Sequence, residues 1–217
     1  MKKIDYHTLV DFFEQKMKEP LPGLSAQLKM EPPHRNNEFR KNPDFSNYRR
    51  SAVLIILWVD QDILKTAFIL RPEYDGFHSN QIAFPGGKSE KSDQSFIHTA
   101  LREANEEVGI NPASVKVVGS LTPLFIPPSK FIVYPIIGIT KSQPDFKTDQ
   151  REVEALLVTD ISIFQQTENI VKQQFIVRDT IIDDIPCYKM GSHFVWGATA
   201  MILSELLELI KPLSITE

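Results

Sequence analysis

The chain contains very little cysteine, no long apolar run and no concentration of positive charge. One cysteine among 217 residues cannot form a disulfide within the chain, which predicts a reducing, cytoplasmic compartment. The longest apolar run, residues 52–59, is far too short to cross a bilayer, and the first residues lack the apolar core of a signal peptide. The formal net charge is −4 and the basic residues form no cluster beyond short pairs, so we expect neither nucleic acid nor a membrane as the main partner.

The composition that remains is that of an ordinary globular protein. Because 42% of the 217 residues are hydrophobic, the chain can bury a full core, and we expect residues 1–217 to form one domain. A helix over 5–18 and a polar, proline-containing loop are expected to make up residues 1–48, with the core in 49–211. No reactive motif surrounds Cys187, which we interpret as a small packed residue.

The order of the apolar runs predicts an α/β fold in which a mixed sheet lies between helical layers. A long amphipathic helix over 194–210 closes the pattern. The runs with strand character are residues 52–59, 66–70, 115–121, 131–140, 152–158 and 174–182.

The most informative segment begins with Gly-Gly-Lys at 86–88, which predicts a tight turn. The helix expected after it carries Glu103, Glu106 and Glu107 at positions i, i+3 and i+4. Residues at these spacings share one face of a helix, where three like charges repel each other. A hard divalent cation such as Mg2+ relieves that repulsion, because a few carboxylates bind it together with phosphate oxygens of a substrate. The alternative is a solvated helix face with one or two Arg–Glu pairs.

The remainder of this helix supports the metal interpretation. Arg102 lies at the edge of the acidic face, and Asp93 is expected to cap the free amides at the helix start. Gly109 suits the left-handed residue that commonly ends a helix. The side expected to anchor the helix in the core is an apolar stripe formed by Ile97, Ala100, Leu101, Ala104 and Val108.

Residues 102–110 resemble the second half of the Nudix box, in which Arg-Glu, an aliphatic residue, a spacer, Glu-Glu, a spacer and Gly-aliphatic follow one another. The first half departs from the pattern of that family. Gln94 stands where the box has a glutamate, and Gly87 lies one residue too far upstream. Asp93 and Glu90 are the nearby carboxylates that would compensate.

Further segments resemble the coenzyme A diphosphatase branch of the Nudix family. They are Gln-Ile-Ala-Phe-Pro-Gly-Gly-Lys at 81–88, Pro-Ser-Lys-Phe at 128–131 with Val-Tyr-Pro at 133–135, and Trp-Gly-Ala-Thr-Ala at 196–200. The upstream signature of the branch is altered. Arg71 is present, but Ala-Phe-Ile at 67–69 replaces Leu-Leu-Thr, and Gly76 and Asn80 stand where an arginine and a glycine belong.

This resemblance implies an α/β/α sandwich with a mixed sheet, an N-terminal helix and a long C-terminal helix. It implies a hydrolase that uses Mg2+ or Mn2+ to split the diphosphate bridge of a nucleoside diphosphate derivative. The expected substrate is coenzyme A or acyl-coenzyme A, with (acyl-)4'-phosphopantetheine and adenosine 3',5'-bisphosphate as products. The altered upstream signature keeps ADP-ribose or another nucleoside diphosphate derivative open. A non-catalytic Nudix-fold regulator that binds nucleotides is the third alternative.

The same resemblance assigns roles to the acidic helix and the glycine segment. Glu106 and Glu107 are expected metal ligands, and Glu103 is either a further ligand or the base that accepts a proton from water. Gly87 is expected to offer its carbonyl oxygen to the metal. Arg102 is expected to pair with a helix glutamate and fix its rotamer. The expected catalytic group is therefore Glu103, Arg102 and Glu106.

Four residues outside the helix are further candidates. Glu152, at the start of a run with strand character, is an extra ligand, the base, or a solvent-facing carboxylate at a strand edge. Lys88, His78 and Arg71 are candidate contacts for substrate phosphates, with a solvated lysine and a structural loop histidine as the alternatives. A homodimer is also open, since members of the family often pair; the N-terminal helix would then supply a contact, or else cover its own core.

Overall fold

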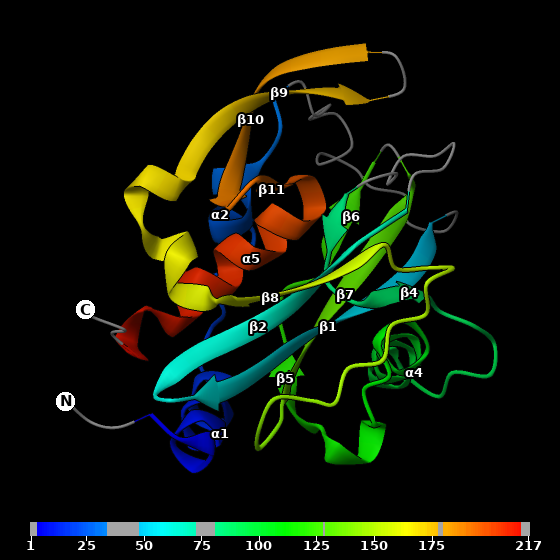
Figure 1. The fold of residues 1–217 in the computed structure, drawn as a ribbon, viewed down its shortest axis with the longest axis vertical. Helices are drawn as coiled ribbons and strands as arrows, with labels where there is room; N and C mark the ends of the chain where they lie inside the picture. Colours follow the sequence, from blue (N-terminus) through cyan, green and yellow to red (C-terminus); the bar gives the residue numbers. More distant parts are fainter. Residues whose placement is uncertain (1–3, 34–47, 73–80, 128, 178–179, 214–217) are drawn as a thin grey trace.

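A computed structural model describes residues 4–33, 48–72, 81–127, 129–177 and 180–213, and its centre is an eight-stranded mixed sheet (Figure 1). The order of its main path is β3-β2-β1-β7-β5, while β4, β6 and β8 pair with β1, β7 and β2. The sheet is mixed because β1 runs parallel to β7 and antiparallel to β2. Its strands are β1 (Arg49–Asp60), β2 (Ile63–Leu70), β3 (Ile82–Ala83), β4 (Gly86–Lys88), β5 (Lys116–Ser120), β6 (Leu124–Ile126), β7 (Phe131–Ile139) and β8 (Ala155–Asp160).

Both faces of this sheet are covered, as the runs of apolar residues in β1 require. Leu54 and Ile56 of β1 pack in one core cluster with residues of α4 (Phe96–Val108), whereas the alternate residues Ile55 and Leu57 belong to the other core cluster. Successive side chains of a strand point to opposite faces. The sheet therefore lies between α4 on one side and the terminal helices on the other, and the predicted α/β/α sandwich is confirmed (Figure 1).

The second layer brings the two ends of the described chain together. α5 (Gly197–Ile210) is buried over most of its length and contacts α2 (Gly23–Gln27). α1 (Tyr6–Lys16) adds Leu9 and Phe13 to the same core cluster. The remaining helical turns are 3-10 segments at η1 (Leu28–Met30), η2 (Pro112–Ser114), η3 (Ile161–Gln165), η4 (Thr167–Asn169) and η5 (Lys211–Leu213).

A second, three-stranded sheet was not expected from the sequence. It consists of β9 (Ile170–Val177), β10 (Thr180–Met190) and β11 (His193–Trp196), in the order β11-β10-β9. The single strand expected over 174–182 is therefore wrong, because that run spans the two arms of a hairpin in which Thr180 pairs with Val177. The sequence offers no Gly or Pro at 178–179 to mark the reversal.

Three local expectations are also corrected. Gly-Gly-Lys at 86–88 is not a turn but strand β4, paired antiparallel with β1. Glu152 does not open a strand: it lies in the turn before β8, which begins at Ala155. Ile97 of the expected apolar stripe is 42% exposed. Cys187, by contrast, is fully buried as interpreted, and burial raises the pKa of its thiol to about 11.

None of the helices in the described part of the chain is long and apolar enough to span a membrane.

Candidate active site

Helix α4 begins and ends with local signals that fix its position against β4. Ser95 is the N-cap, and its side chain accepts a hydrogen bond from the amide of His98. The cap expected at Asp93 is therefore wrong. Gly109 ends the helix in the left-handed conformation, with φ 72°, as predicted. A side chain at Gly109 would also meet Lys147, with a Cβ only 2.9 Å from the Cβ of Lys147.

Arg102 uses all five of its N–H donors to hold the acidic groups in place. Its Nε and Nη2 donate to the two oxygens of Asp93, both at 3.0 Å. Its Nη1 donates to Glu103 at 3.0 Å and to Glu106 at 3.1 Å, and Nη2 also donates to the carbonyl of Lys88 at 3.2 Å. The expected pairing of Arg102 with a helix glutamate is confirmed, and Asp93 is its second anchor.

Glu107 lies on the inner edge of the acidic face and is 1% exposed, although the sequence placed it among the solvent-side acids. It accepts a hydrogen bond from the amide of Gly86 at 2.7 Å and from the guanidinium of Arg71 at 3.2 Å. Burial raises the pKa of Glu107 to about 7; Arg71 and the Gly86 amide oppose the rise, and repulsion from Glu103 adds to it.

Glu103 is packed directly against the backbone of β4. A Cβ built on Gly87 would overlap the Glu103 carboxylate, so the glycine makes room for that group. Burial raises the pKa of Glu103, Arg102 lowers it, and repulsion from Glu106 and Glu152 raises it.

Glu152 approaches this group from another part of the chain. Its charge raises the pKa values of both Glu103 and Glu107, which places it within electrostatic range of the acidic face. The adjacent turn is tied to α4, because the amide of Asp149 donates to the carbonyl of Glu107 at 3.0 Å and the amide of Glu152 donates to the carbonyl of Asp149 at 3.0 Å. Four carboxylates thus converge from one helix and one turn.

The donor set suits a hard divalent cation, since it consists of carboxylate oxygens beside a glycine backbone. As the side chains stand, no three His, Cys, Asp or Glu groups of the described ranges are arranged to hold a metal ion. Arg102 and Arg71 bind the carboxylates instead, and these ion pairs balance charge that a cation would otherwise neutralise. Glu103, Glu106, Glu107 and Glu152 are the residues that could hold a cation after their side chains turn.

The other candidate residues have different positions. Arg71 is not aimed freely at solvent, because it binds Glu107 and donates to the carbonyl of Gly86 at 2.9 Å. Lys88 is exposed at the end of β4, and its carbonyl accepts from Arg102. His78 lies outside the described residues, as do Gly76 and Asn80.

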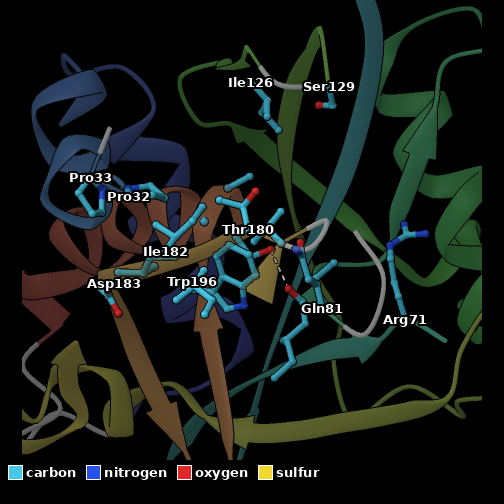
Figure 2. A pocket seen from close by; sticks show the side chains of 18 residues that line it. Pro32, Pro33, Arg71, Gln81, Ile126, Ser129, Thr180, Ile182, Asp183 and Trp196 are labelled. Carbon is cyan, nitrogen blue, oxygen red and sulfur yellow. Dashed lines mark hydrogen bonds between the residues drawn. The ribbon is translucent and has the colours of Figure 1, made fainter. Parts of the chain in front are cut away.

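A cavity of about 560 Å³ adjoins the acidic group and was not foreseen from the sequence. Figure 2 shows Arg71 at one side of the cavity, with Trp196 and Ile182 toward the other. β10 and the start of α5 supply much of its wall. Segments singled out in the sequence supply part of the lining, namely Arg71, residues 81–83, Ser129 and residues 196–199, whereas the residues of β10 carry no motif.

Comparisons with known proteins show the family of this chain. A family model described as NUDIX domain matches residues 48–172. A Homo sapiens protein named mitochondrial coenzyme A diphosphatase NUDT8 is 30% identical over 164 residues, which cover 75% of this chain and 70% of that protein. The chain therefore belongs to the Nudix hydrolase family, and the enzyme class expected from the acidic helix is confirmed.

Other relatives share the family name. Nudix hydrolase 15, mitochondrial, of Arabidopsis thaliana is 34% identical over 170 residues, covering 75% of this chain but only 59% of that protein. An uncharacterized Nudix hydrolase NudL of Yersinia pestis is 35% identical over 166 residues, covering 75% of this chain and 80% of that protein. Since two of these relatives are named mitochondrial, the cytoplasmic compartment of this chain stays a prediction.

Two solved structures support the fold alone. RenU, a Nudix hydrolase from M. smegmatis, has a TM-score of 0.52 at 11% identity and covers 78% of this chain and 89% of its own. A MutT/nudix family protein from Enterococcus faecalis has a TM-score of 0.52 at 13% identity and covers 96% of this chain and 75% of its own.

Proposed function

We propose that this protein is a divalent cation-dependent diphosphatase of coenzyme A or acyl-coenzyme A. The products are 4'-phosphopantetheine, or its acyl form, and adenosine 3',5'-bisphosphate. Mg2+ or Mn2+ is the proposed cation. The observation that carries the proposal is the convergence of Glu103, Glu106, Glu107 and Glu152 beside the glycines of β4.

This convergence is unfavourable without a partner of opposite charge. The pKa values of Glu103 and Glu107 are raised chiefly by burial, and repulsion from other carboxylates adds to the rise, so their ionised forms gain from a nearby cation. When bound, a divalent cation supplies charge neutralisation at the diphosphate and a lower pKa for the attacking water.

The residues of the chain have separate tasks in this proposal. Glu106 and Glu107 hold the cation, with Gly87 offering its carbonyl. Glu103 or Glu152 accepts the proton of the attacking water. Burial raises the pKa of Glu103, which makes its carboxylate a stronger base than an exposed one. Arg102 positions Glu103 and Glu106 through its hydrogen bonds.

The organic part of the substrate is proposed from likeness and from charge. The relative named coenzyme A diphosphatase is similar to this chain over 75% of its length. Lys88 and Arg71, with His78, are the proposed phosphate contacts. Arg71 would have to divide its hydrogen bonds between Glu107 and a phosphate oxygen.

ADP-ribose, or another nucleoside diphosphate derivative, is the second candidate substrate. One of the sequence differences that favoured this candidate loses its weight in the structure. The altered residues Ala67, Phe68 and Ile69 are all 0% exposed in β2. Their change from Leu-Leu-Thr therefore alters core packing and not a substrate contact. Gly76 and Asn80 remain the reason to test this substrate.

The test is a mass-spectrometric product assay with coenzyme A, acyl-coenzyme A and ADP-ribose, each with Mg2+ or Mn2+. We expect phosphopantetheine products, and we expect Glu106→Gln to lower kcat by at least about 100-fold because a cation ligand is lost. Glu154→Gln is the control: it makes the same substitution at an exposed glutamate that is not among the four grouped carboxylates. AMP and ribose 5-phosphate as the sole products would exclude the coenzyme A assignment, and full activity of the Glu106 variant would exclude the metal role of α4.

A further inference from the structure

Arg71 links the cavity to the diphosphate position proposed above. Arg71 lines the cavity and also donates to Glu107 and to the carbonyl of Gly86. A substrate whose diphosphate lies at the carboxylates therefore extends one of its two organic halves past Arg71 into the cavity. Figure 2 shows Arg71 at one side of the cavity, apart from Ile182 and Trp196.

The walls of the cavity are mostly apolar, and their polar side chains are mostly uncharged. Ile181, Ile182 and Ile185 of β10 and Trp196 contribute side chains, facing Ile126 across the space. Among the described residues that line it, the charged ones are Arg71 and Asp183. Asp183 accepts a hydrogen bond from Nε2 of Gln174 at 2.5 Å. A volume of about 560 Å³ is in the usual range for a small-molecule site.

These walls discriminate between the two halves of coenzyme A. The adenosine 3',5'-bisphosphate half carries a 3'-phosphate, which needs cations or several N–H donors to leave water. The pantetheine half is uncharged, and an acyl group on its sulfur is wholly apolar. Among the described lining residues, the one cation, Arg71, is already paired with Glu107, and Asp183 would repel a further phosphate. The rest of the lining is apolar or polar and uncharged, which fits the amides and the acyl group of the second half.

A buried hydroxyl gives an independent sign of a ligand in this cavity. Ser129 lines the space and is 6% exposed, yet its Oγ has no hydrogen-bond partner within the described residues. A buried polar group without a partner is uncommon, because it has lost water without compensation. The pantetheine arm contains two amides, and either of them can form a hydrogen bond with the hydroxyl of Ser129.

We propose that this cavity is the subsite for the acyl-pantetheine half, and that acyl-coenzyme A with a medium-length saturated acyl chain is a better substrate than free coenzyme A. The inference rests on the proposed diphosphatase function. Ile182 and Trp196 are then determinants of specificity, because the acyl chain makes apolar contacts with these two side chains. Even one buried methylene is worth about 10-fold in discrimination, so octanoyl-coenzyme A should exceed coenzyme A in kcat/KM by at least about 10-fold.

The first measurement compares kcat/KM for octanoyl-coenzyme A and coenzyme A in three proteins. Ile182→Glu places a charge in the cavity wall and should lower the value for octanoyl-coenzyme A at least about 10-fold more than the value for coenzyme A, because only the octanoyl chain loses an apolar contact there. Ile176→Glu is the matched control on the same hairpin: Ile176 is 73% exposed and does not line the cavity. Circular dichroism and thermal unfolding of each variant confirm that it folds.

The second measurement needs no hydrolysis. S-octanoylpantetheine, which lacks the diphosphate, is titrated calorimetrically into each protein with EDTA present. We expect binding by the wild type and by Ile176→Glu, and at least about 10-fold weaker binding by Ile182→Glu.

The two measurements separate the two proposals. Equal kcat/KM for both substrates, together with no binding of S-octanoylpantetheine, overturns the subsite and leaves the diphosphatase standing. If the wild type binds S-octanoylpantetheine, the Ile182 variant does not, and neither coenzyme A nor octanoyl-coenzyme A is hydrolysed, the diphosphatase proposal is overturned and the subsite is supported.

Discussion

At the scale of single residues, Arg102 explains how this helix keeps three glutamates on one face. Its planar guanidinium reaches Asp93, Glu103 and Glu106 at once, which the point charge of a lysine could not do. The sequence left Glu90 and Asp93 as two carboxylates that might replace the missing box glutamate at position 94. In the structure Asp93 is the one of the two that pairs with Arg102, because both of its oxygens accept hydrogen bonds from the guanidinium.

Asp93→Asn should lower the free energy of unfolding by about 1 to 2 kcal/mol at pH 7, because hydrogen bonds between charged groups are lost. The Asp93 side chain is 0% exposed, and Arg102 holds its pKa well below the usual value of 3.8. A depressed carboxyl pKa stabilises the folded state above the unfolded pKa, and the contribution is lost as the pH falls. The difference between wild type and variant should therefore be constant from about pH 7 to about pH 5 and shrink below about pH 4.

Urea unfolding at several pH values measures this difference. Glu90→Gln is the control, since Glu90 is exposed and its side chain accepts from Ser92 rather than from Arg102. A difference that already closes between about pH 7 and about pH 5 would contradict the ion pair as its origin.

At the scale of elements, a buried carboxylate ties α5 to the rest of the second layer. Glu205 is 0% exposed, and it accepts from the amide of Gly23 at 3.0 Å, the hydroxyl of Thr122 at 2.7 Å and the amide of Gln27 at 2.8 Å. These donors come from α2 and from the segment between β5 and β6. Glu205 therefore fixes the placement of α5, whose first turn lines the cavity.

Glu205→Ala should lower the free energy of unfolding by about 3 kcal/mol, because one buried and two partly buried donors lose their acceptor. Glu208→Ala on the same helix is the comparison: Glu208 is 32% exposed and forms surface ion pairs with Lys29 and Lys211, so its loss should cost at most about 1 kcal/mol. Chemical denaturation of both variants measures the difference. Equal losses would show that Glu205 contributes no more than a surface charge.

At the scale of the whole molecule, cation binding and folding stability are linked. The converging carboxylates repel one another in the folded state, and a ligand that binds only the folded state stabilises it by mass action. At about 100 times its dissociation constant, a cation contributes about 2.7 kcal/mol, which corresponds to a rise in Tm of about 5 to 10 °C for a chain of this size.

Differential scanning calorimetry with Mn2+ or Mg2+, against KCl at matched ionic strength, tests this linkage. We expect the rise in Tm for the wild type and little or none for Glu106→Gln. A similar rise in both proteins would place the cation elsewhere on the molecule. The same scans report whether residues 1–217 unfold in one transition, as the core cluster shared by α1, the sheet and α5 leads us to expect.

The sequence alone determined the sandwich, the acidic helix and the family, because these depend on local signals. Apolar periodicity sets strands and helices, and spacing along one helix decides that Glu103, Glu106 and Glu107 are neighbours. Gly109 could likewise be assigned to the end of the helix from its residue type alone.

Only the tertiary structure decided which distant groups complete the site. That Arg71 meets Glu107, that Glu152 approaches the acidic face from a turn, and that β10 walls a cavity all depend on strand order and on the course of the chain between elements. The same holds for the β9–β10 hairpin, which a continuous run of strand-forming residues concealed. Contacts between residues far apart in the chain leave no periodic signal in it, so packing, and not local propensity, specifies them.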